Sequence, residues 1–226
     1  MIINLIQQAS DEGPGIIADW AYLRKYQLLI YHPEQFGILP SIKNSNLLII
    51  LGGPMSANQP LDWLIRERKL ISKAIKQNLP ILGICLGAQQ IAKTLGAKIE
   101  PSNKEVGWDP VYLKKPFNNL PKKLIVLHWH SESFTLPSKA QLLFSSQYLK
   151  NQGFLFKDRI VGLQFHLETK TSNLKEMLLN DGKFVQNSIL KQNSQTIINT
   201  KIPKINQKIL FSLLDYLITK LPKTKK

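Results

Sequence analysis

The chain has 226 residues, of which 43% are hydrophobic, and a formal net charge of +15 at pH 7. We expect one domain over residues 1–226, with C-terminal helices at about 171–220 packed on it. No apolar run approaches the length of about 18 residues that a membrane span needs, and the N-terminus lacks the features of a signal peptide. We therefore expect a cytoplasmic protein without membrane association.

The positive charge is spread along the whole chain. Four of the 30 basic residues are arginine, and the sharpest lysine cluster is the final segment LPKTKK. Proteins that bind nucleic acids usually gather basic residues on one face and favour arginine for bidentate contacts. The composition therefore indicates a lysine-rich background, and we expect no nucleic-acid partner.

The first hundred residues alternate between strand and helix patterns. Apolar runs at 2–6, 47–51 and 80–84 predict strands, and the last two are continuous enough to be buried on both faces. Segments with helical periodicity or helix-forming composition lie between them, at 14–26, 61–75 and 86–97, and Gly96 would cap the third. Strands of this kind alternating with helices indicate a parallel sheet.

The pattern changes after about residue 105. Short strands with turn signals between them are predicted at 109–113, 123–130, 141–146, 153–157 and 160–166, followed by helices at 171–180, 184–193 and 206–221. The last helix presents one apolar face for core packing, made of Ile209, Leu210, Leu213, Leu214, Leu217 and Ile218. The chain as a whole is predicted to be an α/β protein, with helices on a mostly parallel central sheet.

The single cysteine, Cys85, lies in the sequence GICLG between a predicted buried strand and a predicted helix. One cysteine forms no internal disulfide and gives no metal-binding cluster. The G-x-nucleophile-x-G pattern is typical of a sharp strand-to-helix turn, where the helix N-terminus favours thiolate and the Leu86 N–H can donate to an oxyanion. A lone cysteine in apolar surroundings is also a common core residue, so this pattern alone leaves both interpretations open.

The chain offers four histidines as a base for the thiol. His32 has no supporting neighbours. His128 and His130 face the same side of a predicted strand, which makes a metal pair conceivable, but no third ligand is evident and we expect no metal site. His166 ends a predicted strand, and Glu168 follows two residues later, so both side chains point the same way and Glu168 can orient the imidazole.

Gly52 and Gly53 directly follow the apolar run 47–51. Glycines at the end of a parallel strand expose backbone N–H groups at the carboxyl edge of the sheet, where open α/β sheets bind ligands. If the strands at 47–51 and 81–84 are neighbours, these glycines and Cys85 lie at the same edge. An ordinary glycine turn explains Gly52 and Gly53 taken alone, but with the cysteine and the histidine–glutamate pair they indicate one site.

The motifs LGGPMS, GICLGAQQIA, KEVGW, HWH and GLQFHLE occur in this order, and together they resemble the class I (triad-type) glutamine amidotransferases. The likeness is strongest to the stand-alone branch similar to the amidotransferase domain of GMP synthase. It extends from EGPGIIADW near the start of the chain to the C-terminal helices. The resemblance implies a flavodoxin-like, three-layer fold, a glutaminase reaction and no cofactor.

The resemblance also implies a role for each matching residue. Cys85 would attack the side-chain amide of glutamine, and the backbone N–H groups of Gly53 and Leu86 would stabilise the oxyanion. His166, oriented by Glu168, would protonate the leaving ammonia and then activate water to hydrolyse the glutamyl thioester.

Gln89, one helical turn after the cysteine, would hold the substrate, and Gly52, Trp129 and His130 would shape the rest of its pocket. The family often has His-Gly-Asp where this chain has residues 130–132 as His-Ser-Glu. This departure leaves open whether the substrate is glutamine or a larger γ-glutamyl compound.

The family usually has proline between the histidine and the glutamate, where this chain has Leu167. Leucine can adopt the same extended geometry, so we expect a loss of rigidity more than of activity.

A full GMP synthase carries an ATP-using acceptor domain, for which 226 residues leave no room. Ammonia would then pass to a separate synthetase subunit, or the enzyme would act as a γ-glutamyl peptidase or hydrolase with the same triad. An alternative from another class is a catalytically silent binding module that uses the lysine-rich C-terminal region to hold an acidic partner. The intact Cys85, His166 and Glu168 argue against it.

Overall fold

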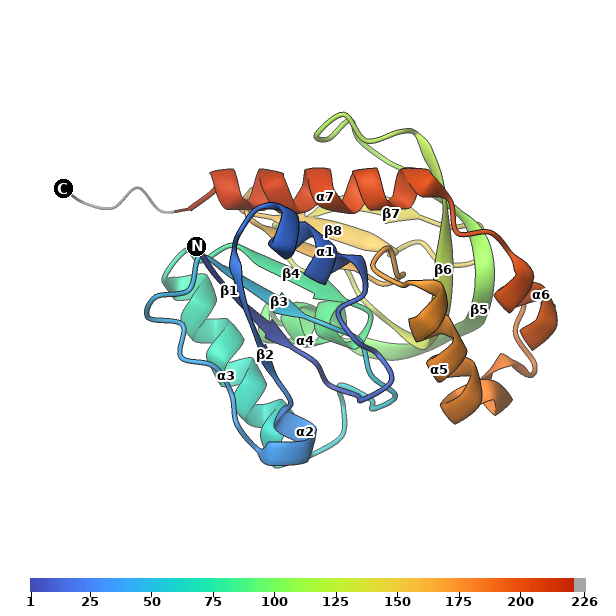
Figure 1. The fold of residues 1–226 in the computed structure, drawn as a ribbon, viewed down its shortest axis with the longest axis horizontal. Helices are drawn as coiled ribbons and strands as arrows, with labels where there is room; N and C mark the ends of the chain where they lie inside the picture. Colours follow the sequence, from blue (N-terminus) through green and yellow to red (C-terminus); the bar gives the residue numbers. More distant parts are fainter. Residues whose placement is uncertain (222–226) are drawn as a thin grey trace.

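The computed structural model describes residues 1–221, and the strands of this part form a nine-stranded sheet in the order β2-β1-β3-β4-β9-β8-β7-β5-β6 (Figure 1). The strands are β1 (Ile2–Ile6), β2 (Gln27–Tyr31), β3 (Leu47–Ile50), β4 (Ile81–Ile84), β5 (Ile99–Leu113), β6 (Lys123–Phe134), β7 (Gln141–Ser145), β8 (Gly153–Phe156) and β9 (Ile160–Leu163). The helices are α1 (Ile16–Leu23), α2 (Pro33–Phe36), α3 (Asp62–Lys76), α4 (Leu86–Thr94), α5 (Thr171–Asp181), a 3₁₀ turn (Gly182–Val185), α6 (Ser194–Asn199) and α7 (Lys204–Thr219). Beyond Leu221, the basic segment at the C-terminus lies outside the described residues.

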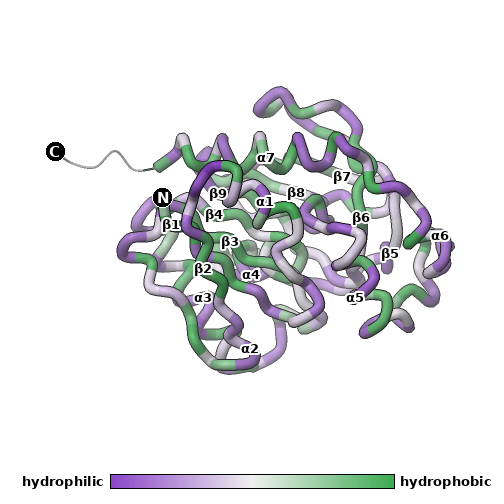
Figure 2. The backbone as a smooth tube through the Cα atoms, in the orientation of Figure 1, coloured by the Kyte–Doolittle hydropathy of each residue, from purple (hydrophilic) through white to green (hydrophobic). Residues whose placement is uncertain are grey.

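The sheet is parallel in one half and antiparallel in the other. β2, β1, β3, β4 and β9 pair in parallel, and the remaining pairs, through β8, β7, β5 and β6, are antiparallel. β1, β3, β4 and β9 are almost entirely buried, as their continuous apolar sequences require (Figure 2). The predicted α/β fold, with helices on a mostly parallel central sheet, is confirmed.

Helices cover both faces of the parallel half. α1 and α7 lie on one face, where Trp20 and Leu213 belong to the same buried cluster, and the predicted apolar face of α7 is buried at Ile209, Leu210, Leu213, Leu214 and Leu217 (Figure 1). α3 and α4 contribute to the cluster on the other face. None of the described helices is long and apolar enough to cross a membrane.

α5 and α6 pack beside the long β5–β6 hairpin. Their buried residues Leu174, Met177 and Ile197 share a third apolar cluster with Trp108 and Trp129. This arrangement brings the end of α5 next to Trp129, whose Nε1 lies 3.3 Å from Asp181 Oδ2.

Residues 184–193 do not form the predicted helix. Only the 3₁₀ turn ending at Val185 is helical there, and Asn187 and Lys191 have positive φ angles of 62° and 53°, which a helix excludes. The segment instead bonds to β5: the Ser188 hydroxyl accepts from the Val106 N–H at 2.9 Å, and the Gln192 amide oxygen accepts from the Trp108 N–H at 2.9 Å. These contacts satisfy strand groups that local periodicity cannot reveal.

A buried carboxyl group holds part of the α3–α4 contact together. Glu67 is fully buried, and its Oε1 accepts a hydrogen bond of 2.9 Å from Gln90 Nε2, while Oε2 has no partner among the described residues. Burial raises the pKa of Glu67 from 4.5 to about 8, against the lowering effects of the Gln90 hydrogen bond and the Arg68 charge. Glu67 is therefore protonated in the folded protein at neutral pH.

This shift predicts a specific pH dependence of stability. The folded protein keeps the Glu67 proton up to about pH 8, whereas the unfolded chain loses it near 4.5, so stability falls as the pH rises through this window. Glu67→Gln, which carries no charge, removes this contribution. Between about pH 5 and about pH 8.5, the free energy of unfolding of the variant relative to the wild type should rise by about 1–3 kcal/mol in urea titrations.

The exposed Glu176 supplies the matched control, because Glu176→Gln should leave the pH dependence unchanged. Parallel stability curves for Glu67→Gln and the wild type would contradict the assignment of a buried, protonated Glu67.

Candidate active site

Cys85 lies on a strained turn between β4 and α4. Its φ and ψ angles are 50° and −111°, a conformation that residues with a side chain rarely adopt. The Cys85 N–H donates to the Leu163 carbonyl of β9 at 2.8 Å, and its own carbonyl accepts from the Gln89 N–H at 3.1 Å. These bonds hold the cysteine between the strand end and the first turn of the helix, with 6% of its surface exposed.

The two glycines of GICLG are required by close packing. A β-carbon on Gly87 would collide with the Ile50 carbonyl oxygen at the end of β3, and one on Gly83 would lie 2.7 Å from the Gly87 carbonyl. β3 and β4 are neighbouring parallel strands, with Ile50 opposite Gly83. The expectation that Gly52, Gly53 and Cys85 share one edge of the sheet is therefore confirmed.

His166 and Glu168 form a buried pair. His166 Nδ1 lies 2.6 Å from Glu168 Oε1, and Glu168 Oε2 accepts a hydrogen bond of 3.0 Å from the Leu167 N–H. β9 ends at Leu163, three residues earlier than predicted, but His166 pairs again with β6 through a bridge to Leu127. The backbone is thus fixed on both sides of the imidazole.

The second imidazole nitrogen, Nε2, is buried and has no hydrogen-bond partner among the described residues. Burial lowers the pKa of His166, but the charge of Glu168 and the interaction with Cys85 outweigh it and raise the pKa well above 6.5. Burial raises the pKa of the Cys85 thiol, and the His166 interactions and the Leu86 N–H oppose that increase. A proton leaving the thiol is therefore retained on His166.

The predicted oxyanion donors and substrate residue lie around the same turn. The Gly87 N–H donates to the Leu51 carbonyl at 3.1 Å, while the Leu86 N–H interacts with the Cys85 sulfur. Gly53 is packed between Gln8 and Leu86, since a β-carbon there would lie 3.2 and 3.3 Å from their side chains.

Gln89 is held on the wall of the site. Its Nε2 donates to the Glu132 carbonyl at 3.1 Å and lies 3.3 Å from Gln164 Oε1. Gln164, which the sequence gave no reason to select, is fully buried, with Nε2 3.7 Å from the Cys85 sulfur.

A pocket of about 160 Å³ opens above Cys85. Its lining comprises Glu12, Gly53, Pro54, Met55, Cys85, Gln89, Trp129, His130, Ser131, Glu132, Asp181 and Phe184. Of the predicted residues, Gly53, Cys85, Gln89, Trp129 and His130 line it, whereas Gly52, Leu86, His166 and Glu168 lie behind the wall. His32 lies at the start of α2, outside the pocket.

Sequence reasoning did not select Glu12, Asp181 or Phe184. Glu12 lies within the EGPGIIADW stretch that contributed to the family likeness, but nothing local marked it as a pocket residue. Asp181 and Phe184 come from the end of α5 and the turn after it, and only the packing of these elements against Trp129 brings them to the site.

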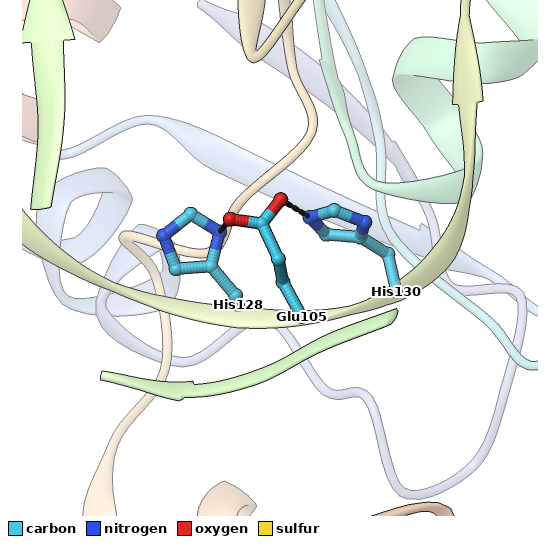
Figure 3. Close-up of side chains that lie close together, drawn as sticks. All are labelled: Glu105, His128 and His130. Atoms are coloured by element: carbon cyan, nitrogen blue, oxygen red, sulfur yellow. Dashed lines mark ion pairs between the residues drawn. The ribbon is translucent and has the colours of Figure 1, made fainter. Parts of the chain in front are cut away.

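His128 and His130 face a third buried residue, Glu105 of β5, which the sequence analysis missed. The Glu105 carboxylate lies between the two imidazoles, 3.9 Å from His128 Nδ1 and 3.5 Å from His130 Nε2 (Figure 3). Glu105 is directly opposite His130 in the β5–β6 register. The Glu105 oxygens also accept hydrogen bonds from Ser146 at 2.9 Å and Gln152 at 2.8 Å.

This cluster is the group of described residues with donor atoms arranged for a metal ion, all within 4.8 Å of one another. Burial lowers the pKa of His128 to about 3 and that of His130 well below 6.5, while burial raises the pKa of Glu105 to about 7. Both imidazoles are therefore uncharged at neutral pH, so their contacts with Glu105 are not ion pairs. Because His130 also lines the pocket, the cluster fixes one of its walls.

Comparison with known proteins agrees with this geometry. The family model described as glutamine amidotransferase class-I matches residues 21–185. The chain belongs to this family. The matched region contains Cys85, His166, Glu168 and most of the pocket lining.

Individual relatives cover most of the chain. The glutamine amidotransferase-like protein YfeJ of Salmonella typhimurium is 28% identical over 183 residues, which are 74% of this chain and 76% of that protein. A GMP synthase of Campylobacter jejuni is 34% identical over 169 residues, 72% of this chain, and the chain spans only 32% of its length. The crystal structure of a glutamine amidotransferase from Thermotoga maritima superposes with a TM-score of 0.88 at 28% identity, covering 96% of this chain and 98% of that one.

The close approach at Gly87 predicts a large difference between two glycine substitutions. Gly87→Ala places a methyl group against the Ile50 carbonyl and should lower the free energy of unfolding by about 1–3 kcal/mol. Gly182→Ala is the control, because nothing lies within 4 Å of its β-carbon position and its φ is −58°. Chemical denaturation that finds the two variants equally stable would contradict the tight packing at the Cys85 turn.

Proposed function

We propose that this protein hydrolyses the side-chain amide of glutamine to glutamate and ammonia through a thioester on Cys85. The proposal rests on one observation above all: a strained cysteine at the carboxyl edge of the sheet lies beside a buried histidine that a glutamate orients. Family membership supports amide hydrolysis in general. The roles of the individual residues are our assignment.

In the first half-reaction, His166 takes the Cys85 proton and the thiolate attacks the amide carbon. The Leu86 and Gly53 N–H groups donate to the oxygen that becomes negatively charged. When the C–N bond breaks, His166 returns its proton to the departing nitrogen, and ammonia leaves. The γ-glutamyl group is then bound to sulfur as a thioester.

In the second half-reaction, His166 takes a proton from water, and the resulting hydroxide attacks the thioester carbon. The C–S bond breaks, and the proton returns to the Cys85 sulfur as glutamate leaves. Glu168 keeps Nδ1 protonated and Nε2 directed at the reaction in both steps.

We assign the rest of the pocket to binding of the glutamyl group. Gln89, Trp129 and His130 line it and Gly52 lies directly behind it, next to His166. Because GMP synthase relatives extend well beyond the aligned region, we propose that the ammonia is delivered to a separate synthetase or acceptor protein.

A second candidate is hydrolysis of a larger γ-glutamyl compound by the same residues. It is supported by the extent of the pocket, which continues from Cys85 to Asp181 and Phe184. Glutamine and γ-glutamyl dipeptides, assayed for released ammonia and glutamate, distinguish the two. Release of glutamate from the dipeptides alone would reject the glutamine proposal.

Cys85→Ser should reduce amide hydrolysis by at least about 10³-fold, because a serine hydroxyl is a far weaker nucleophile beside this histidine. Ammonia and glutamate release by the purified protein measure the effect, and an unchanged thermal midpoint shows that the fold persists. Activity close to that of the wild type would refute the assignment of the nucleophile.

A catalytically silent module predicts a different outcome for labelling. A glutamine-analogue electrophile should modify Cys85 rapidly, and excess glutamine should protect it. Absence of any modification would favour the silent module over the enzyme.

Glu168→Gln should lower kcat by about 10²–10⁴-fold with little change in KM, since the amide cannot hold His166 as the carboxylate does. Glu176→Gln, an exposed position on α5, is the matched control and should retain full activity. An equal effect of both substitutions would show that Glu168 does not orient the base.

A further inference from the structure

Glu12 is a carboxyl group of the pocket that the proposed reaction does not use. It lies on the loop between β1 and α1, which is fixed by a 2.8 Å hydrogen bond from the Ile16 N–H to the Glu168 carbonyl. Gly15, with φ of 51°, allows this loop to approach Glu168 so closely that a β-carbon there would collide with the same carbonyl. The position of Glu12 is therefore tied to the catalytic strand end.

One oxygen of Glu12 has no partner. The residue as a whole is partly exposed to the pocket, but Oε2 is inaccessible to solvent and accepts no hydrogen bond from the described residues. A buried carboxylate oxygen without a donor is costly, and such groups in native proteins usually meet a ligand or an ion. Burial raises the pKa of Glu12 from 4.5 to about 7, which reflects that missing donor.

The unpartnered oxygen lies on the His166 side of the site. A β-carbon at Gly52 would collide with Glu12 Oε2 and would also lie 3.2 Å from His166 Cε1, so both atoms border the same small space. His166 is the group that hands a proton to the departing nitrogen. Glu12 therefore borders the leaving-group side of the scissile amide, whereas Gln89 lies against Glu132 on another part of the wall.

Asp181 adds a second carboxylate to the pocket. Its charge is among those that act on Glu12, and its Oδ2 accepts from Trp129 Nε1 at 3.3 Å. Among the described residues, the pocket lining includes three acidic residues and no lysine or arginine. In a chain with 30 basic and 15 acidic residues, this distribution points to a cationic ligand group.

We propose, building on the hydrolase function above, that Glu12 and Asp181 receive the amine side of the scissile amide and select γ-glutamyl amides of positively charged amines over γ-glutamyl amino acids. The ammonium group of such an amine supplies the donor that Glu12 Oε2 lacks. A γ-glutamyl amino acid would bring its own carboxylate towards two others, which is unfavourable in a partly desolvated pocket. Hydrolysis consumes one water and releases glutamate and the free amine.

Three ligands of matched size test the proposal: the γ-glutamyl amides of ethylenediamine (cationic), propylamine (neutral) and glycine (anionic). Their dissociation constants are measured by calorimetry at about pH 8 with the Cys85→Ser protein, so that binding does not depend on turnover. The cationic ligand should bind about 10–100-fold more tightly than the anionic one. Glu12→Gln and Asp181→Asn, each in the Cys85→Ser background, should each reduce this ratio at least about threefold.

Asp11→Asn is the control, because Asp11 also acts on Glu12 through its charge but does not line the pocket, and it should leave the ratio nearly unchanged. Equal affinity for the three ligands, no binding of any of them, or a ratio that survives both Glu12→Gln and Asp181→Asn would overturn the proposal. A uniform loss of affinity in Glu12→Gln would also overturn it, since Glu12 would then bind the shared glutamyl group.

Turnover by the wild-type protein separates this proposal from the function on which it rests. Hydrolysis of all three amides without preference for charge would reject the leaving-group site and retain the hydrolase. If neither glutamine nor any of the amides is hydrolysed, the hydrolase proposal fails, while the order of affinities in the Cys85→Ser protein still decides whether this wall selects cations.

Discussion

The site depends on the contact between Gly87 and the end of β3. The strand-to-helix turn brings the first turn of α4 against the Ile50 carbonyl, with no room for a side chain. The positive φ of Cys85 is maintained because the cysteine is bonded to β9 on one side and to α4 on the other. Backbone strain of this kind persists only where the surroundings over-determine it. Here the surroundings are the core of the parallel sheet.

The same packing controls the protons of the site. Burial makes it costly for the Cys85 thiol to lose its proton to solvent, and the pairing of His166 with Glu168 makes the histidine a good acceptor. Leu167 contributes to this arrangement in a way that proline cannot, because its N–H donates to Glu168 Oε2. The loss of rigidity expected from this leucine is thus offset by an additional hydrogen bond to the orienting carboxylate.

The sequence predicts those parts of the site that depend on short spacing. GICLG indicates the turn at Cys85, and the two-residue interval between His166 and Glu168 places both side chains on one side of an extended chain. Continuous apolar runs likewise predict the buried parallel strands. These features depend on local sterics, and the structure reproduces them.

Tertiary contacts supply the rest, and short patterns do not encode them. Glu105 meets His130 through the register of a long antiparallel hairpin, and Glu12 reaches the pocket because its loop is bonded to Glu168. The helix expected at 184–193 is replaced by a segment bonded to β5, whose polar partners lie more than 80 residues away along the chain.

The central claim is that Cys85 carries the γ-glutamyl group during the reaction. Acid quench of the protein during turnover of glutamine, followed by mass spectrometry of its peptides, tests it directly, because the chain has a single cysteine. We predict a γ-glutamyl adduct on the peptide containing Cys85, which hydroxylamine removes and which does not form in Cys85→Ser. Release of glutamate at the wild-type rate with no adduct on that peptide, or with the adduct on another residue, would contradict the account.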